Sequence, residues 1–199
     1  MNFQLNNIPE RTTKNRSHGL TMVMDKGLSI RQAEDLIDSA CNQVDIVKLG
    51  FGTSAFAGNV KEKVKLYKKA NIRVYVGGTL FEAFYVRGQI DDYKKYIDQL
   101  GLDTVEISDG SMSIAHGKKC EIIQSFAKDY KVLSEVGSKE EGILISPARW
   151  IKMMQNELAA GSWKVIAEAR ESGTVGIYRP NGQAHVLLIN KIIKNVNPE

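Results

Sequence analysis

The sequence predicts an α/β fold of the TIM (β/α)8 barrel type, because short β-branched segments alternate with longer helical patterns along its 199 residues. The six expected strands begin on average about 29 residues apart, which suits a repeating βα unit. Charged or small polar residues follow almost every strand. A barrel gathers all its strand ends around one mouth, whereas an open doubly wound sheet concentrates its site at one switch point, so these residues favour the barrel.

The strands are expected where Val, Ile and Thr cluster in short runs. They cover residues 20–24, 44–50, 72–78, 104–108, 131–136 and 164–169. The segments between them carry apolar residues at i, i+3 and i+4, which predicts helices. These helices cover residues 29–42, 60–70, 80–100, 117–130, 146–160 and 185–195. Ser29 and Ser146-Pro147 are typical of helix starts, and Gly101 and Gly161 of helix ends.

Composition and charge exclude several classes of protein. The 27 Lys and Arg residues are interleaved with 23 Asp and Glu residues, giving a formal charge of +4, so no basic stripe indicates a nucleic-acid partner. No apolar run approaches the roughly 18 residues of a membrane span, and the first residues lack the apolar core of a secretory signal. We therefore expect a cytoplasmic protein that binds neither nucleic acid nor membrane.

The domain organisation is expected to be an N-terminal arm, residues 1–19, followed by one barrel domain, residues 20–199. Only about six βα units fit into the chain, whereas a complete barrel has about 250 residues. The sequence thus predicts an incomplete barrel without the last two strands. The first and sixth strands would then have unpaired edges, which favours a homo-oligomer.

Acidic residues stand near the ends of three consecutive strands. Glu106, Glu135 and Glu168 lie within otherwise apolar segments. Burying three carboxylates is costly unless something positive neutralises them. Since Mg²⁺ prefers oxygen ligands, we expect the three to bind one Mg²⁺ ion; the alternative is that each is solvated or paired with Lys or Arg.

Six motifs, in order along the chain, resemble the phosphosulfolactate synthase family. They are RTTKNRSHGLTMVMDKGLS (11–29), DIVKLGFGTS (45–54), YVGGTLFE (75–82), VEISDGS (105–111), KVLSEVGSK (131–139) and AEARESGTVGI (167–177). The resemblance implies a barrel lyase that adds sulfite to phosphoenolpyruvate with Mg²⁺ and forms (2R)-2-phospho-3-sulfolactate. The pathway that uses this product could end in coenzyme M or in sulfolactate. Asn15 departs from the family, which usually has Pro there. The family also continues through two more strands, so the barrel domain is expected to be truncated at its C-terminus relative to it.

This reaction needs a cation and a proton donor. Lys48 shares one strand face with Ile46 and Gly50, and we expect it to act as the general acid at C2 or as the cation facing the substrate carboxylate. The alternative is a structural ion pair. Glu106 and Glu135 are the other expected catalytic residues.

An anionic substrate would need further polar groups at the strand ends. The candidate substrate-binding residues are Asp25, Lys26, Gly78, Thr79, Ser108, Arg170 and Ser172. Each has a structural alternative. Arg170 could form an internal salt bridge equally well, and any single glycine could serve only a tight turn.

Two other functions remain open. A Schiff-base aldolase could use Lys48 as its nucleophile on the same scaffold. Alternatively, the chain could be a non-catalytic, synthase-like structural or stress-associated protein, a hypothesis that the missing strands favour.

Overall fold

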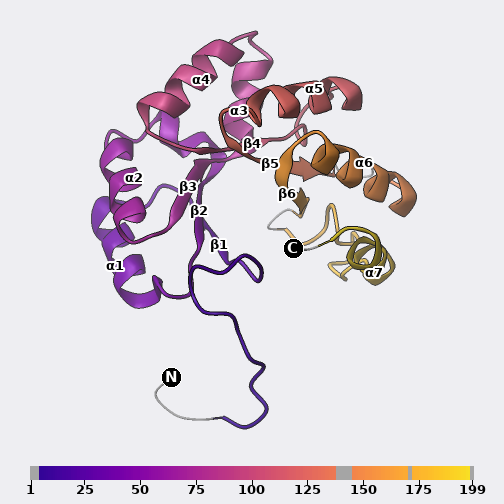
Figure 1. Ribbon diagram of the computed structural model, residues 1–199, viewed down its shortest axis with the longest axis horizontal. Coiled ribbons are helices and arrows are strands. Elements are labelled where there is room, and N and C mark those ends of the chain that lie inside the picture. Colours follow the sequence, from indigo (N-terminus) through magenta and orange to yellow (C-terminus); the bar gives the residue numbers. More distant parts are fainter. Residues whose placement is uncertain (1–4, 138–144, 170–171, 198–199) are drawn as a thin grey trace.

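The computed structural model describes residues 5–137, 145–169 and 172–197, and within them strands and helices alternate (Figure 1). The strands are β1 (Met22–Asp25), β2 (Ile46–Leu49), β3 (Arg73–Val76), β4 (Thr104–Ile107), β5 (Lys131–Val136) and β6 (Ser162–Ala167). The helices are α1 (Ile30–Ala40), α2 (Val60–Lys69), α3 (Gly78–Tyr85), α4 (Ile90–Gln99), α5 (His116–Phe126), α6 (Pro147–Ala159) and α7 (Val186–Asn195), together with a 3-10 segment, η1 (Gly50–Ala55).

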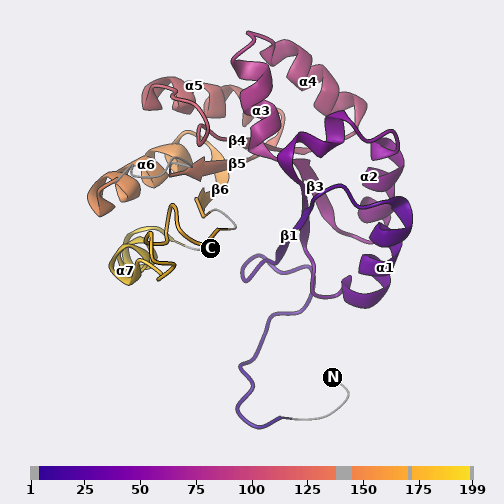
Figure 2. The ribbon, with the colours of Figure 1, turned by 180° about the vertical axis from the view of Figure 1, so that it is seen from behind.

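The six strands run parallel in two hydrogen-bonded ladders, β1-β2-β3 and β4-β5-β6, each in sequence order. Figure 1 shows β3 beside β4 and the helices on the outer side of the resulting curve, and Figure 2 shows the same arrangement from behind. Parallel strands in sequence order with helices outside are the architecture of a (β/α) barrel, here with six strands in the described residues. The predicted fold class is confirmed.

Alternation along the strands divides the side chains between two faces. Val47, Val74, Val105 and Val132 lie in the main core, between the strands and the surrounding helices. A separate inner cluster lies on the concave face. Its buried members are Ile46, Tyr75 and Leu133, with Leu20, Trp163 and Ile166 packed against them.

Side chains join the two ladders at the boundary between β3 and β4. At the amino ends, Nη1 of Arg73 donates to both carboxylate oxygens of Asp103 at 3.0 Å and to Oγ1 of Thr104 at 2.9 Å. At the carboxyl ends, the backbone N–H of Gly78 donates to Oε1 of Glu106 at 2.7 Å. The boundary is therefore held at both ends by polar contacts.

The helix boundaries confirm the expected caps. The Ser29 hydroxyl accepts from the N–H of Gln32, whose side chain accepts from the N–H of Ser29, and Ser146 caps α6. The helix expected over residues 80–100 is instead two helices, α3 and α4. Gly88 adopts a left-handed conformation (φ 68°) between them, which ends the first helix and turns the chain into the second.

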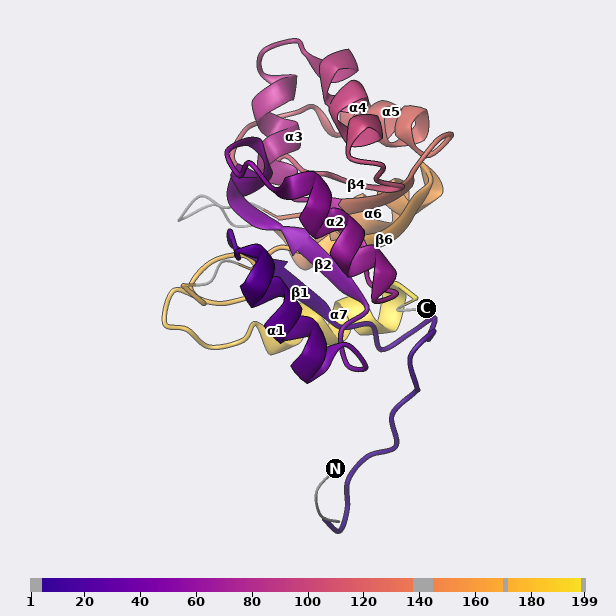
Figure 3. The same ribbon diagram turned by 90° about the vertical axis from the view of Figure 1, so that its left-hand side faces the viewer.

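The segment before β1 extends away from the body of the protein, as Figure 3 shows. Its later part is anchored by Lys14, whose Nζ donates to the carbonyl oxygens of Cys41 at 2.6 Å and Ala70 at 3.1 Å. These two residues are the C-caps of α1 and α2. One ammonium therefore satisfies carbonyl groups at the ends of two helices.

Candidate active site

Lys48 forms the centre of the candidate site. It points to the inner face of β2, and its Nζ lies 2.8 Å from Oε1 of Glu106 and 3.8 Å from Oε2 of Glu135. The two carboxylates come from β4 and β5 and are 0% and 4% exposed. The structure thus brings together the three residues predicted to be catalytic. The partly buried ammonium of Lys48 thus lies between two buried carboxylates.

Two glycines give this cluster its space. A Cβ atom on Gly77 would lie 2.8 Å from Cε of Lys48, and one on Gly78 would lie 2.6 Å from Oε1 of Glu106 and 2.1 Å from Oγ of Ser108. A side chain at either position would therefore displace a site residue. Gly78 was predicted to bind substrate; in the structure its N–H donates to Glu106 and orients that carboxylate.

Burial dominates the electrostatics of the cluster. Burial raises the pKa of Glu106 above its ordinary value and nearby Glu135 raises it further, while Lys48 and the Gly78 N–H act in the opposite direction. Burial and the neighbouring Glu106 also raise the pKa of Tyr75 well above its ordinary value. Tyr75, which pairs with Lys48 in the neighbouring strand, therefore stays a neutral phenol, and its hydroxyl lies 2.8 Å from Sδ of Met22.

Asp25 was predicted to bind substrate, and the structure places its carboxylate among internal partners. Its carboxylate is fully buried and is held by Lys63 at 2.9 Å, Tyr67 at 3.1 Å and the N–H groups of Gly27 and Leu28. The physical reason is alternation. Asp25 lies one residue beyond Met24, which pairs with Lys48, so its side chain points to the opposite face, toward α2.

Ser108, another predicted substrate-binding residue, also has an internal partner. Its hydroxyl donates to the carboxylate of Glu82 on α3, which also accepts from the N–H groups of Gly110 and Ser111, each at 3.1 Å. Ser108 is fully buried, and this contact links the loop after β4 to α3. Sequence analysis missed Glu82, although its place inside the motif YVGGTLFE was a signal.

Three other predicted substrate-binding residues lie at the surface near strand ends. Lys26 directly follows β1, Thr79 is in the first turn of α3, and Ser172 lies five residues after β6. All three are exposed. The Nζ of Lys26 lies 6.0 Å from the ring centroid of Phe51, in η1. Arg170 lies outside the described residues.

The predicted three-carboxylate metal site is not formed. Glu168 is 4% exposed at the end of β6, and its N–H donates to the carbonyl of Val136 at 2.9 Å. Within residues 5–137, 145–169 and 172–197, no three His, Cys, Asp or Glu side chains are grouped to hold one metal ion. Lys48 supplies positive charge beside Glu106 and Glu135.

A buried charged network supports the site from the helix side. Lys119 on α5 is fully buried, and its Nζ lies 2.8 Å from Asp109 and 2.9 Å from Glu157 on α6. The same ammonium donates to the main-chain carbonyl of Glu135 at 2.5 Å. Sequence analysis missed Lys119. Its spacing of three and four residues from the buried Ile122 and Ile123 was the available signal.

Comparisons with known proteins show which family this chain resembles. The family model described as (2R)-phospho-3-sulfolactate synthase (ComA) matches residues 9–199. A phosphosulfolactate synthase of Methanocaldococcus jannaschii is 39% identical over 90% of this chain and 74% of its own length. Those of Methanothermobacter thermautotrophicus and Bacillus subtilis are 38% and 34% identical over 87% and 94% of this chain, and over 70% and 75% of their own.

Solved structures support the fold alone. A 3-hexulose-6-phosphate synthase superposes with a TM-score of 0.55 at 16% identity, over 89% of this chain and 76% of that one. The Salmonella typhimurium enzyme of the same name gives 0.54 at 15% identity, over 87% and 72%. No helix in the described residues is long and apolar enough to cross a membrane. The family model and the relatives are decisive: this chain belongs to the phosphosulfolactate synthase family.

Proposed function

We propose that this protein is a lyase that adds sulfite to phosphoenolpyruvate and forms (2R)-2-phospho-3-sulfolactate in the cytoplasm. The observation that carries the proposal is the position of Lys48 between Glu106 and Glu135 at the carboxyl half of the strands, on three motifs of the family. In barrel enzymes this end of the strands is where active sites are found.

The chemistry requires a fixed cation beside a carboxylate. Sulfur of sulfite attacks C3 and forms the C–S bond, while the electrons of the C2–C3 double bond move toward the substrate carboxylate, giving an enediolate. Protonation at C2 then completes the product. In our proposal Lys48 stabilises the developing negative charge and delivers the proton, because Glu106 and Glu135 fix its ammonium in one place.

We also propose a Mg²⁺ ion bound by fewer protein ligands than the sequence suggested. Oε2 of Glu106 is buried and has no hydrogen-bond partner, which fits a cation ligand. Mg²⁺ is commonly held by one or two carboxylates together with substrate phosphate. Glu106, with Glu135, would hold it, and the ion would supply further positive charge for the enediolate. Lys26, Thr79, Arg170 and Ser172 remain the proposed groups for the phosphate and sulfite.

The contacts of Lys48 favour this function over a Schiff-base aldolase. An imine-forming lysine must bring its Nζ to the carbonyl carbon of a substrate, whereas Nζ of Lys48 is held by the carboxylates of Glu106 and Glu135. Borohydride in the presence of a carbonyl substrate is therefore expected to leave Lys48 unmodified.

The decisive assay follows the enol-phosphate absorbance of phosphoenolpyruvate with the purified 199-residue chain. We expect loss of absorbance only when sulfite and Mg²⁺ are both present, and product with a C–S bond by mass spectrometry. A folded, Mg²⁺-supplied protein that leaves phosphoenolpyruvate unchanged would contradict the proposal and favour a non-catalytic role.

We further propose that the chain forms a homo-oligomer. In the described residues β1 and β6 each pair with a strand on one side only, and such edges favour association with another chain. Light scattering after size-exclusion chromatography should give a multiple of 22.1 kDa, and a mass of one chain at all concentrations would contradict this.

A further inference from the structure

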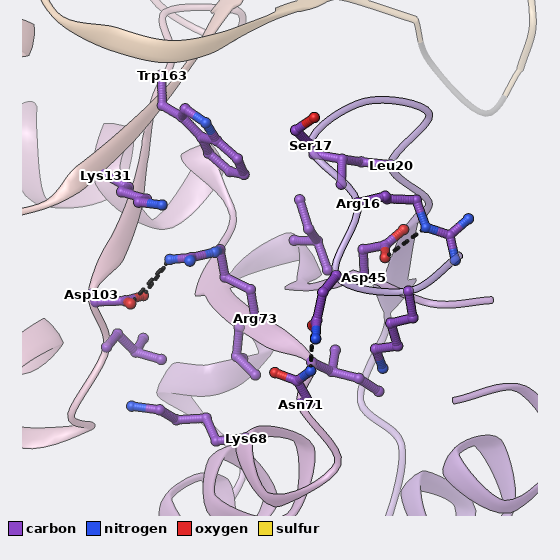
Figure 4. Close-up of a pocket in the computed structure, with 16 residues that line it drawn as sticks. Arg16, Ser17, Leu20, Asp45, Lys68, Asn71, Arg73, Asp103, Lys131 and Trp163 are labelled. Carbon is purple, nitrogen blue, oxygen red and sulfur yellow. Dashed lines mark hydrogen bonds and ion pairs between the residues drawn. The ribbon is translucent and has the colours of Figure 1, made fainter. Parts of the chain in front are cut away.

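A cavity of about 440 Å³ opens at the amino ends of the strands, the opposite end from Lys48. Arg73 and Lys131 are the first residues of β3 and β5, and Trp163 is the second residue of β6. Figure 4 shows these three side chains along one side of the cavity and the segment around Ser17 on the other. The cavity is therefore separate from the candidate active site, which lies at the carboxyl half of the same strands.

Two positive groups lie at the same indole ring. Cζ of Arg73 is 5.4 Å and Nζ of Lys131 is 4.9 Å from the ring centroid of Trp163. Arg73 has a carboxylate partner, Asp103, at 3.0 Å. In the part of the chain that the structure describes, no carboxylate lies at ion-pair distance from Lys131. Two neighbouring cations repel each other, so an anion placed between them would be stabilised.

The whole lining has this excess of positive charge. Its charged members are Lys14, Arg16, Lys68, Arg73 and Lys131 against Asp45 and Asp103. The remaining wall is largely apolar and includes Leu20, Ile46 and Val74 beside Trp163. The lining thus offers both positive groups for an anion and apolar surface for a hydrocarbon or ring.

The family motif RTTKNR forms part of the rim, and the candidate active site uses none of its residues. Lys14 is bonded to two helix ends, and Nε of Arg16 lies 3.2 Å from Asp45. Nδ2 of Asn71 donates to Oδ1 of Asn15 at 2.7 Å. These contacts hold the arm against the cavity, so the rim is formed before any ligand binds.

We propose that this cavity is a binding site for a small organic anion, with its charged group between Arg73 and Lys131 and its apolar part against Trp163, Ile46 and Leu20. Its volume is in the range of sites for small molecules. The site goes beyond the proposed function, and no step of sulfite addition depends on it.

The test uses NMR of the indole N–H groups of the full chain, which has two Trp residues. Trp163 lines the cavity and Trp150 is 2% exposed elsewhere, and a Trp150→Phe variant assigns the two signals. Titration with benzenesulfonate is expected to shift the Trp163 signal saturably and to leave Trp150 unchanged. A shift that does not saturate, or that sodium chloride at equal ionic strength reproduces, would overturn the proposal.

Matched variants and ligands test the two halves of the cavity. Lys131→Gln should weaken benzenesulfonate binding about tenfold, because one charge-assisted contact is lost, whereas Lys128→Gln, an exposed change outside the lining, should not. Benzenesulfonamide, which lacks the charge, should bind more weakly by a similar factor. Equal weakening in both lysine variants would refute an anion site, and inorganic sulfate binding as tightly as benzenesulfonate would refute an organic ligand.

Discussion

Lys48 on β2 reaches past β3 to Glu106 on β4, with 2.8 Å between Nζ and Oε1. The contact crosses the boundary between the two hydrogen-bonded ladders, and it is buried. A charge-assisted bond of this kind is stronger than a neutral one and fixes both groups. The candidate chemistry and the alignment of the two ladders therefore depend on the same pair.

Replacing Lys48 should remove the proposed activity. In Lys48→Met we expect the rate of sulfite addition to fall at least about 100-fold, because neither a fixed cation nor a proton donor remains. Lys48→Arg keeps the charge but not its position, so it should stay folded and still lose most activity. Steady-state rates beside circular dichroism check both, with the exposed Lys65→Met as control. Full turnover in folded Lys48→Met would exclude a catalytic role.

Gly78→Ala should damage both the fold and the site. The new Cβ would clash sterically with the side chains of Ser108 and Glu106. We therefore expect the free energy of unfolding to fall by about 1–3 kcal/mol. Gly117→Ala is the matched control, because nothing lies within 4 Å of its Cβ position in α5, and it should be neutral or stabilising. Urea denaturation measures both, and equal stabilities would contradict the packing argument.

Lys119→Met should be strongly destabilising. It leaves Glu157 and Asp109 without their shared ammonium, and breaking a buried ion pair on one side typically costs about 3–5 kcal/mol. Adding Glu157→Leu should recover part of this loss, since the uncompensated buried carboxylate is removed. Lys118→Met, on the exposed face of the same helix, is the control. A Lys119→Met protein as stable as this control would show that the network contributes nothing.

His116 should titrate below its ordinary pKa. Partial burial lowers the pKa of its ring first, and the positive charges of Lys119 and Arg149 lower it further, against the opposing effect of Asp109. At pH values just below 6.5, the ordinary pKa of histidine, the unfolded chain therefore binds more protons than the folded chain. The stability that His116 contributes is present above pH 6.5 and is lost as the pH falls through the pKa of the folded state.

An NMR titration of the His116 ring proton tests this directly. Arg149→Gln, an exposed change, should move the midpoint upward because it removes one of the cations. A midpoint above 6.5 in the original chain, or no upward movement in the variant, would contradict the assigned causes.

The sequence predicted strands, caps and fold class well because these depend on local patterns. Ser29 and Ser146 cap helices as expected, and Lys48, Glu106 and Glu135 meet because alternation and strand order place them on one face. The same alternation turns Asp25 to the helix side, whereas its place at a strand end had suggested a substrate contact.

Other features depend on tertiary contacts that no local pattern contains. Glu82 and Lys119 are buried because partners from other parts of the chain form hydrogen bonds and ion pairs with them. The carboxylate of Glu168 does not join those of Glu106 and Glu135 in one group. The cavity at the amino ends needs the arm before β1 to fold back beside Trp163. Sequence spacing alone does not specify such an approach.

The bond from Lys14 to the carbonyl of Ala70 spans 56 residues of chain. During synthesis Lys14 leaves the ribosome before its acceptor at the end of α2 has been made. Lys14 can therefore reach its final position only after both α1 and α2 have been made, although it precedes them in the chain.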